Sequence, residues 1–251
     1  MKSARQRKAG LLGLLLAGLA FAVGVPHGVR LLSALGLPAG AGWSAAADQQ
    51  SSAAAHPWDW PERDKWQRPE EVMNELHLRT GSRVADVGCG SGYFTFHLAG
   101  RVGPQGKVYA EDIQPELIRN LWHQVLSKWL VQVRPVLGDA DNPHLPRQRL
   151  DAILLVHSYH EMRPHEVLVK AFYRALRPGG LLGIIEFEAP DSQRRADSYQ
   201  HHRIPARTVR EEITAQGFEF VAKEPGFKAP EAAKDRNQYF LLFEKPEENR
   251  P

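Results

Sequence analysis

Short apolar runs alternate with amphipathic stretches from about residue 56 to the end of the chain. Short runs bounded by turn residues are typical of buried strands, and apolar positions three or four residues apart are typical of helices. Their regular alternation predicts an α/β domain with a largely parallel sheet. Strands are expected at residues 83–87, 107–112, 131–137, 150–156, 181–187, 218–222 and 238–243. Helices are expected at residues 69–78, 93–98, 115–129, 164–176 and 206–216.

The last two predicted strands differ from the others in how they are connected. A glycine and two prolines lie between residues 222 and 238, with no convincing helical pattern. Parallel neighbours need a long crossover connection that is usually a helix, whereas antiparallel neighbours do not. These two strands are therefore expected to pair antiparallel, unlike strands of an all-parallel dinucleotide fold.

The N-terminal region has a pattern of its own. A basic head is followed by an apolar, uncharged run at residues 10–25. This order is typical of a secretory signal, and the run is shorter than the roughly 20 residues of a transmembrane helix. Residues 20–22 and 45–47 both fit a small-x-small cleavage site. The basic residues are Lys2, Arg5, Arg7 and Lys8.

We therefore interpret residues 1–47 as a signal peptide or membrane anchor followed by a linker. Residues 48–66 are expected to be a linker or lid segment. Its tryptophans either cover the bound ligand or pack on the surface, and they are Trp58, Trp60 and Trp66. The main domain is expected at residues 67–246, with a tail at residues 247–251. This organisation predicts an exported bacterial protein, periplasmic or membrane-anchored, with membrane association through its N-terminal segment.

Composition narrows the partners further. The net charge of +3 includes the basic head, so the main domain is nearly balanced. A nucleic-acid-binding domain needs a strong basic patch, and none is evident, so no nucleic acid is expected. The single cysteine, Cys89, cannot form an internal disulfide, and we interpret it as a small filler in a glycine-rich loop.

The clearest candidate for ligand binding is the loop that runs from Asp86 to Gly92 between a predicted strand and helix. Glycines at 88, 90 and 92 permit positive φ angles and let the backbone approach a ligand closely. The start of the next helix offers free N–H groups to an anionic or polar ligand. The loop lacks the G-x-x-G tail of the nicotinamide-dinucleotide fingerprint, which counts against an oxidoreductase.

Acidic residues follow the next two strands. Asp112 ends the second strand, where a carboxylate can accept both hydroxyls of a ribose, and its spacing from the loop is near the roughly 20 residues expected. The adjacent Glu111 is the alternative. Asp139 follows the third strand, and an acid there could meet an adenine amino group, because ligands bind at the carboxyl ends of strands in open α/β sheets.

In order and spacing, these motifs together resemble class I S-adenosylmethionine-dependent methyltransferases. The resemblance covers roughly residues 56–245. It implies a seven-stranded, mostly parallel sheet in the order 3-2-1-4-5-7-6, with the last strand antiparallel and helices on both faces. The cofactor that it implies is S-adenosylmethionine. The motifs that carry it are residues 84–92, 109–113, 138–140 and 176–180.

The resemblance also implies roles for single residues. The glycines of the loop would cradle the methionine moiety of the cofactor, with Asp112 at the ribose and Asp139 near the adenine. Asp86, at the start of the motif, is included in the cofactor site. The three glycines are Gly88, Gly90 and Gly92.

A narrower resemblance links the chain to a group of bacterial, often exported, predicted methyltransferases. Relatives in that group commonly carry a second histidine where this chain has Glu161. The residues that carry this likeness are 66–69, 158–161, 202–204 and 238–243.

The acceptor side is expected just past the fourth strand, at Tyr159, His160 and Glu161. Methyl transfer needs alignment above all, and a general base only when the acceptor loses a proton. His160 is the candidate base, and Glu161 would orient it or bind an acceptor amine. Alternatively, Tyr159 and His160 only shape the pocket wall. At the end of the fifth strand, Glu186 and Glu188 share one face of the strand, and one of them is a further candidate.

A metal site on this side of the domain is the other possibility. The segment His201, His202 and Arg203 could join His160 and Glu161 in space. No local metal-ligand spacing is present in the sequence, so no metal is expected.

Four functions remain open. The leading expectation is a methyltransferase that acts on a small-molecule acceptor, and a methyltransferase with a protein or membrane-bound acceptor shares every motif. A nicotinamide-dependent oxidoreductase is disfavoured by the loop and by the antiparallel pair. A non-catalytic cofactor- or partner-binding protein stays open, because export would separate the domain from a cofactor made in the cytosol.

Overall fold

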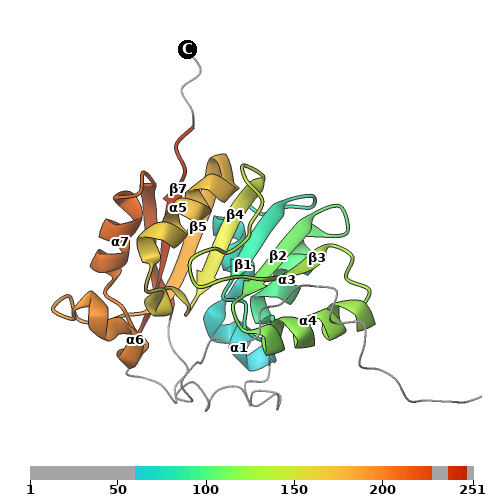
Figure 1. Ribbon diagram of the computed structural model, residues 1–251, viewed down its shortest axis with the longest axis horizontal. Helices are drawn as coiled ribbons and strands as arrows, with labels where there is room; N and C mark the ends of the chain where they lie inside the picture. The colour runs from blue at the N-terminus through green and yellow to red at the C-terminus, as the bar shows by residue number, and fades with distance from the viewer. Residues whose placement is uncertain (1–59, 228–236, 248–251) are drawn as a thin grey trace, which may run out of the picture. The chain divides into compact units, whose positions relative to one another are not determined.

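The computed structural model describes residues 60–227 and 237–247, which form a seven-stranded sheet in the order β3-β2-β1-β4-β5-β7-β6 (Figure 1). Strand β7 pairs antiparallel with β5 and β6, and the other pairs are parallel. The predicted fold class and strand order are confirmed. The strands are β1 (Arg83–Val87), β2 (Lys107–Asp112), β3 (Val133–Leu137), β4 (Leu150–Val156), β5 (Leu176–Phe187), β6 (Glu219–Phe227) and β7 (Gln238–Glu244).

Helices cover both faces of the sheet. One apolar core lies between the sheet and α2, α3 and α4, and the second lies between the sheet and α5 and α7. The α-helices are α1 (Trp60–Gln67), α2 (Pro69–Glu75), α3 (Tyr93–Val102), α4 (Pro115–Ser127), α5 (His165–Ala175), α6 (Ser198–His201) and α7 (Ala206–Thr214). Two 3₁₀ turns are η1 (Tyr159–Glu161) and η2 (Arg195–Asp197).

The central strands explain why the apolar runs of the sequence are so continuous. In β1, four consecutive residues after Arg83 are buried, because helices cover the sheet on both sides. The parallel register pairs Val87 with Glu111 of β2 and Leu155 of β4, so these strands end at a common edge. Figure 1 shows α1 and α6 beside this edge, and the loops that follow β1, β2, β4 and β5 meet there.

Several boundaries differ from the predicted ones. The fifth strand was expected at residues 181–187, after a helix that ends at residue 176, but residues 177–180 already belong to β5. Helix α5 does end at Ala175, and the next residue, Leu176, already pairs with Leu150 of β4 before a register shift. The prediction was wrong there because proline and glycine signal a break in a helix, but a strand irregularity accommodates them as well.

Helix α1 was not predicted. It lies within the segment 48–66 that was expected to be a linker or lid, and it extends to Gln67. Its sequence is polar and lacks an apolar stripe, so periodicity gave no signal for it. Residues 1–47 lie outside the described residues. Within residues 60–227 and 237–247, no helix is long and apolar enough to cross a membrane.

Candidate functional site

The glycine loop after β1 takes a conformation that requires glycine at two positions. Gly88 has a φ of +70°, and a Cβ placed there would lie 2.5 Å from the Cβ of Ser158. Gly92 has a φ of +90°, and its Cβ would lie 2.8 Å from Cδ1 of Leu121. The loop therefore passes closely between α4 and the segment that follows β4, and a side chain at position 88 or 92 would meet these neighbours.

Asp112 lies directly against this loop. Its Oδ2 accepts a hydrogen bond from the backbone N–H of Gly90 at 3.0 Å, and its Oδ1 accepts one from the N–H of Gln114 at 2.9 Å. Burial raises the pKa of this carboxyl, and the two backbone hydrogen bonds oppose that rise. A carboxylate oxygen can accept more than one hydrogen bond, so each oxygen of Asp112 can still accept a hydrogen bond from a ligand hydroxyl.

Glu111, the alternative to Asp112, faces the opposite side of β2, because successive strand residues alternate. A Cβ on Gly138 would lie 1.8 Å from Oε1 of Glu111, so this carboxyl fills the space beside that glycine. Burial, followed by the nearby charge of Asp112, raises the pKa of Glu111 to about 8. Both acids reach the loop through their side chains, because Glu111 accepts a hydrogen bond from the backbone of Gly88 and Asp112 accepts one from that of Gly90.

Asp86 links the strand before the loop to the helix after it. Its buried carboxylate accepts a hydrogen bond from the Thr95 hydroxyl of α3 at 2.6 Å, and burial raises its pKa to about 6. Asp139, by contrast, is exposed at the end of β3, where its Oδ2 lies 2.8 Å from Nε2 of His144. Both acids therefore stand at the carboxyl edge of the sheet, but in different surroundings.

Arg63 of α1 was missed in the sequence. Its guanidinium carbon lies 3.8 Å from the centroid of the Tyr93 ring, directly after the glycine loop, and its Nε donates to Oε1 of Gln67 at 2.8 Å. Burial lowers the pKa of Arg63, and the negative charges nearby, Asp86 among them, oppose that effect. The only hint in the sequence was the four-residue spacing of Arg63 and Gln67, which places both side chains on the same face of a helix. Helix α1 thus brings a half-buried cation to the start of α3, directly after the loop.

The second half of the site is built on η1, directly after β4. The Ser158 hydroxyl donates to the carbonyl of Val87 at 3.0 Å, so η1 is tied to the end of β1 beside the glycine loop. The next residue, Tyr159, is fully buried, and its hydroxyl donates to Glu212 of α7 at 2.8 Å. The phenol of Tyr159 therefore positions η1 against α7.

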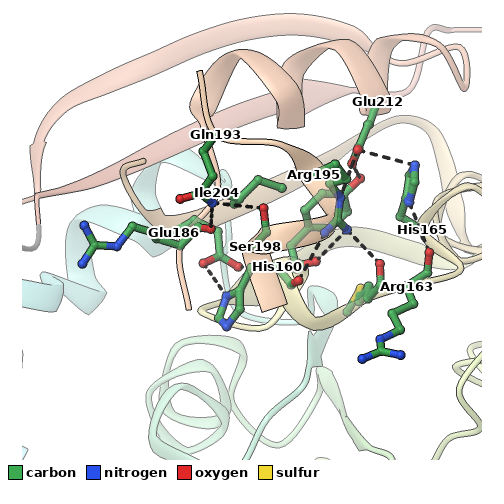
Figure 2. Close-up of polar contacts among 12 residues, drawn as sticks. His160, Arg163, His165, Glu186, Gln193, Arg195, Ser198, Ile204 and Glu212 are labelled. Carbon is green, nitrogen blue, oxygen red and sulfur yellow. Dashed lines mark hydrogen bonds and ion pairs between the residues drawn. The ribbon is translucent and has the colours of Figure 1, made fainter. Parts of the chain in front are cut away.

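His160 is fixed by a buried carboxylate. Its backbone N–H donates to Oε1 of Glu186 at 3.1 Å, and its Nδ1 lies 2.9 Å from Oε2 of the same residue (Figure 2). His160 is 3% exposed and Glu186 is 0% exposed. Burial lowers the pKa of His160, but the contacts with Glu161 and Glu186 outweigh burial and raise it to about 9. Glu186, not Glu188, is the acid that reaches η1, because Glu188 bonds the N–H of Ala206 and Lys223.

A second histidine lies next to this pair. His157 stacks on Phe187 with ring centroids 4.1 Å apart, and its Nδ1 lies 3.9 Å from Oε2 of Glu186. Burial lowers the pKa of His157 to about 4. Two buried imidazoles thus share one carboxylate, and their opposite pKa shifts make His157 neutral.

Arg195 of η2 braces the turn, a role that no local sequence signal indicated. Its guanidinium donates to the carbonyls of Tyr159, His160 and Met162, at 3.3, 3.2 and 2.8 Å. Its Nε also donates to Oε1 of Glu212 at 3.0 Å (Figure 2). One side chain therefore ties the segment between β5 and α7 to the backbone that carries His160.

His202 completes the cluster. One ligand-type atom from each of His160, Glu161 and His202 lies within 4.8 Å of the others. The adjacent Arg203, which the sequence groups with His202, contacts another residue, because its backbone carbonyl accepts a hydrogen bond from the Gln193 side chain. The sequence has no local metal-ligand spacing that would indicate this cluster, because the fold brings together residues about 40 positions apart along the chain.

The sequence is similar to known methyltransferases over part of its length, which includes the glycine loop, Asp112 and η1. Residues 84–180 match the family described as "Methyltransferase domain". Demethylmenaquinone methyltransferase of Geobacillus sp. (strain WCH70) is 28% identical over 126 residues, which cover 50% of this chain and 53% of that protein. The chain thus spans about half the length of the curated relatives that it matches.

Solved structures agree on the fold. A SAM-dependent methyltransferase from Aquifex aeolicus matches with a TM-score of 0.62 and 23% identity, over 74% of this chain and 93% of that chain. Phosphoethanolamine N-methyltransferase 2 of Haemonchus contortus, solved with S-adenosyl-L-methionine, matches with a TM-score of 0.60 and 17% identity, over 72% of this chain and 53% of that chain. The chain therefore shares its fold with these solved methyltransferases, and its residues 84–180 match the methyltransferase-domain family.

Proposed function

We propose that this protein is an S-adenosylmethionine-dependent methyltransferase that acts on a small-molecule acceptor. The observation that carries the proposal is the match of residues 84–180 to a methyltransferase domain, together with a glycine loop closed by the side chain of Asp112. The antiparallel β7 adds support, because an all-parallel nicotinamide-binding sheet has no such strand.

In this proposal the cofactor lies along the carboxyl edge of β1, β2 and β3. The loop glycines leave space for the methionine moiety of the cofactor. Asp112 accepts hydrogen bonds from the ribose hydroxyls, and Asp139 lies near the adenine. Asp86 holds the loop through Thr95. The guanidinium of Arg63 offers positive charge next to the loop, which suits the cofactor's carboxylate.

The acceptor lies on the η1 side. Ser158 ties η1 to the end of β1, so the polar groups of His160 and Glu161 stand beside the glycine loop. Positioning an acceptor against the sulfonium methyl supplies most of the rate acceleration. His160 and Glu161 are the proposed acceptor-side residues, held rigid by Glu186 and Arg195. Tyr159 acts through them, since its hydroxyl is engaged by Glu212.

A small-molecule acceptor is supported by the acceptors of similar proteins. Demethylmenaquinone methyltransferase and phosphoethanolamine N-methyltransferase are both named for small acceptors. The acceptor of this chain is proposed to belong to that broad class, with no nucleic acid.

The N-terminal segment supports a separate proposal, that the protein is exported and either periplasmic or anchored in the membrane. The basic head and apolar run at residues 10–25 support it. Cell fractionation combined with the mass of the mature N-terminus tests this. A periplasmic or membrane-bound chain is expected, and a full-length chain in the cytosolic fraction would contradict it.

Titration of the full-length protein with S-adenosylhomocysteine by calorimetry tests the cofactor. Asp112→Ala should lose about 1.5–3 kcal/mol of binding free energy, the usual range for hydrogen bonds to a charged group, or about tenfold to 150-fold in affinity. Glu166→Ala, at an exposed position on α5, is the matched control and should bind as the wild type does. No binding by folded wild-type protein, or binding of NADH instead, would refute the proposal.

A further inference from the structure

Three side chains from two distant segments converge at the acceptor side of the domain. His160 and Glu161 belong to η1, and His202 follows α6. Nε2 of His160 lies 3.6 Å from Oε1 of Glu161, and the same Oε1 lies 3.8 Å from Nδ1 of His202. Two imidazoles and a carboxylate are a set that borderline divalent ions such as Zn²⁺ bind.

The orientation of His160 is the second observation. Its Nδ1 and backbone N–H are both occupied by Glu186, so only Nε2 is left to face Glu161. That Nε2 atom is buried and has no hydrogen-bond partner among the described residues. A buried carboxylate on one ring nitrogen, with the other nitrogen left to bind a ligand, is the arrangement that surrounds metal-bound histidines, because it fixes the ring and raises its basicity.

The distances suit an ion after a small contraction. Metal–ligand bonds of about 2.0–2.1 Å in a tetrahedral site place ligand atoms roughly 3.3 Å apart. The atoms here lie within 4.8 Å of one another. The side chains of Glu161 and His202 are 50% and 54% exposed, so they can move toward an ion while His160 stays fixed.

We propose that His160, Glu161 and His202 form a binding site for one divalent transition-metal ion of the Zn²⁺ type, with Glu186 as the carboxylate that orients His160. Three protein ligands leave a coordination position open, as in catalytic zinc sites. Binding of the ion itself does not depend on methyl transfer. The role of the bound ion, which is to hold an oxygen or nitrogen atom of the acceptor at the open coordination position, rests on the proposed function.

The test uses untagged full-length protein, treated with a chelator and then titrated with Co²⁺, which reports tetrahedral coordination by its visible absorption, and with Zn²⁺ in competition. One ion is expected per chain. Glu161→Gln and His202→Ala should each weaken Co²⁺ binding at least tenfold, and Glu186→Gln about 10–100-fold, as is typical for an outer carboxylate. His201→Ala, at an exposed neighbouring position, is the matched control and should leave binding unchanged.

Calorimetry with S-adenosylhomocysteine on the same samples confirms that each variant is folded and separates the two proposals. If Co²⁺ fails to bind, or binds equally well to Glu161→Gln and His202→Ala, the metal site is wrong and His160 instead forms an ion-pair cluster with Glu161 and Glu186. Loss of cofactor binding with intact Co²⁺ binding would overturn the proposed function but leave the metal site standing.

Discussion

Replacement of Glu111 by glutamine should change how stability depends on pH. The carboxyl is 3% exposed, and burial together with the charge of Asp112 raises its pKa from 4.5 to about 8. The folded protein therefore holds this proton more tightly than the unfolded chain does. Its contribution is fully present below about pH 4.5 and is lost as the pH rises through about 8. At about 1.4 kcal/mol per pH unit, the loss reaches about 5 kcal/mol as an upper bound.

Glu111→Gln keeps the shape and cannot ionise, so it should lose this pH dependence. Urea unfolding of wild type and variant from pH 5 to pH 8.5 measures the effect as the difference between the two curves, which cancels other titrating groups. The variant should gain on the wild type by several kcal/mol between pH 5 and pH 8.5. Glu116→Gln, at an exposed position on α4, should run parallel to wild type. If the Glu111→Gln curve also runs parallel to the wild type, the reasoning about its burial is wrong.

Three further predictions follow from the site. Gly92→Ala should cost about 1–3 kcal/mol of stability in thermal unfolding, because position 92 has a positive φ and an added Cβ would lie 2.8 Å from Leu121. The control Gly100→Ala lies on α3, where an added Cβ meets no neighbour, and should not destabilise the protein. Equal effects of the two substitutions would contradict this prediction. Arg195→Met should cost about 2–3 kcal/mol in urea unfolding, since three carbonyls lose the hydrogen bonds that Arg195 donates and Glu212 loses its arginine partner. Exposed Arg194→Met should stay within about 0.5 kcal/mol, and a similar loss in both would argue against a brace. Arg63→Met should weaken S-adenosylhomocysteine about tenfold in calorimetry, and unchanged affinity would remove Arg63 from the cofactor site.

The parts of the fold that could be predicted from the sequence are those with local causes. The bounds of β1, β2 and β4 agree with the expected ranges, because strands buried on both faces are continuous apolar runs bounded by turn residues. The glycine loop and Asp112 were recognisable for the same reason, since a turn with positive φ angles requires glycine at fixed positions. Such features depend on neighbours a few residues away.

The acceptor side could be predicted only in part. His160 and Glu161 were expected from their place after the fourth strand, but the roles of Glu186, Arg195 and His202 depend on contacts across 26 to about 40 residues. No periodicity encodes such contacts, because they arise only when the segment between β5 and α7 folds over η1. The same limit explains why the local spacing did not indicate that His160, Glu161 and His202 lie together.

The most direct test of the central claim is transfer of a labelled methyl group. The full-length protein is incubated with methyl-labelled S-adenosylmethionine and a bacterial extract, which is then separated into small-molecule, protein and lipid fractions. We predict label in the small-molecule fraction, matched by an equal amount of S-adenosylhomocysteine and abolished by Asp112→Ala. Label confined to the protein or lipid fraction would contradict the small-molecule acceptor. Absence of S-adenosylhomocysteine in every fraction, from protein that binds the cofactor, would show a non-catalytic binding protein instead.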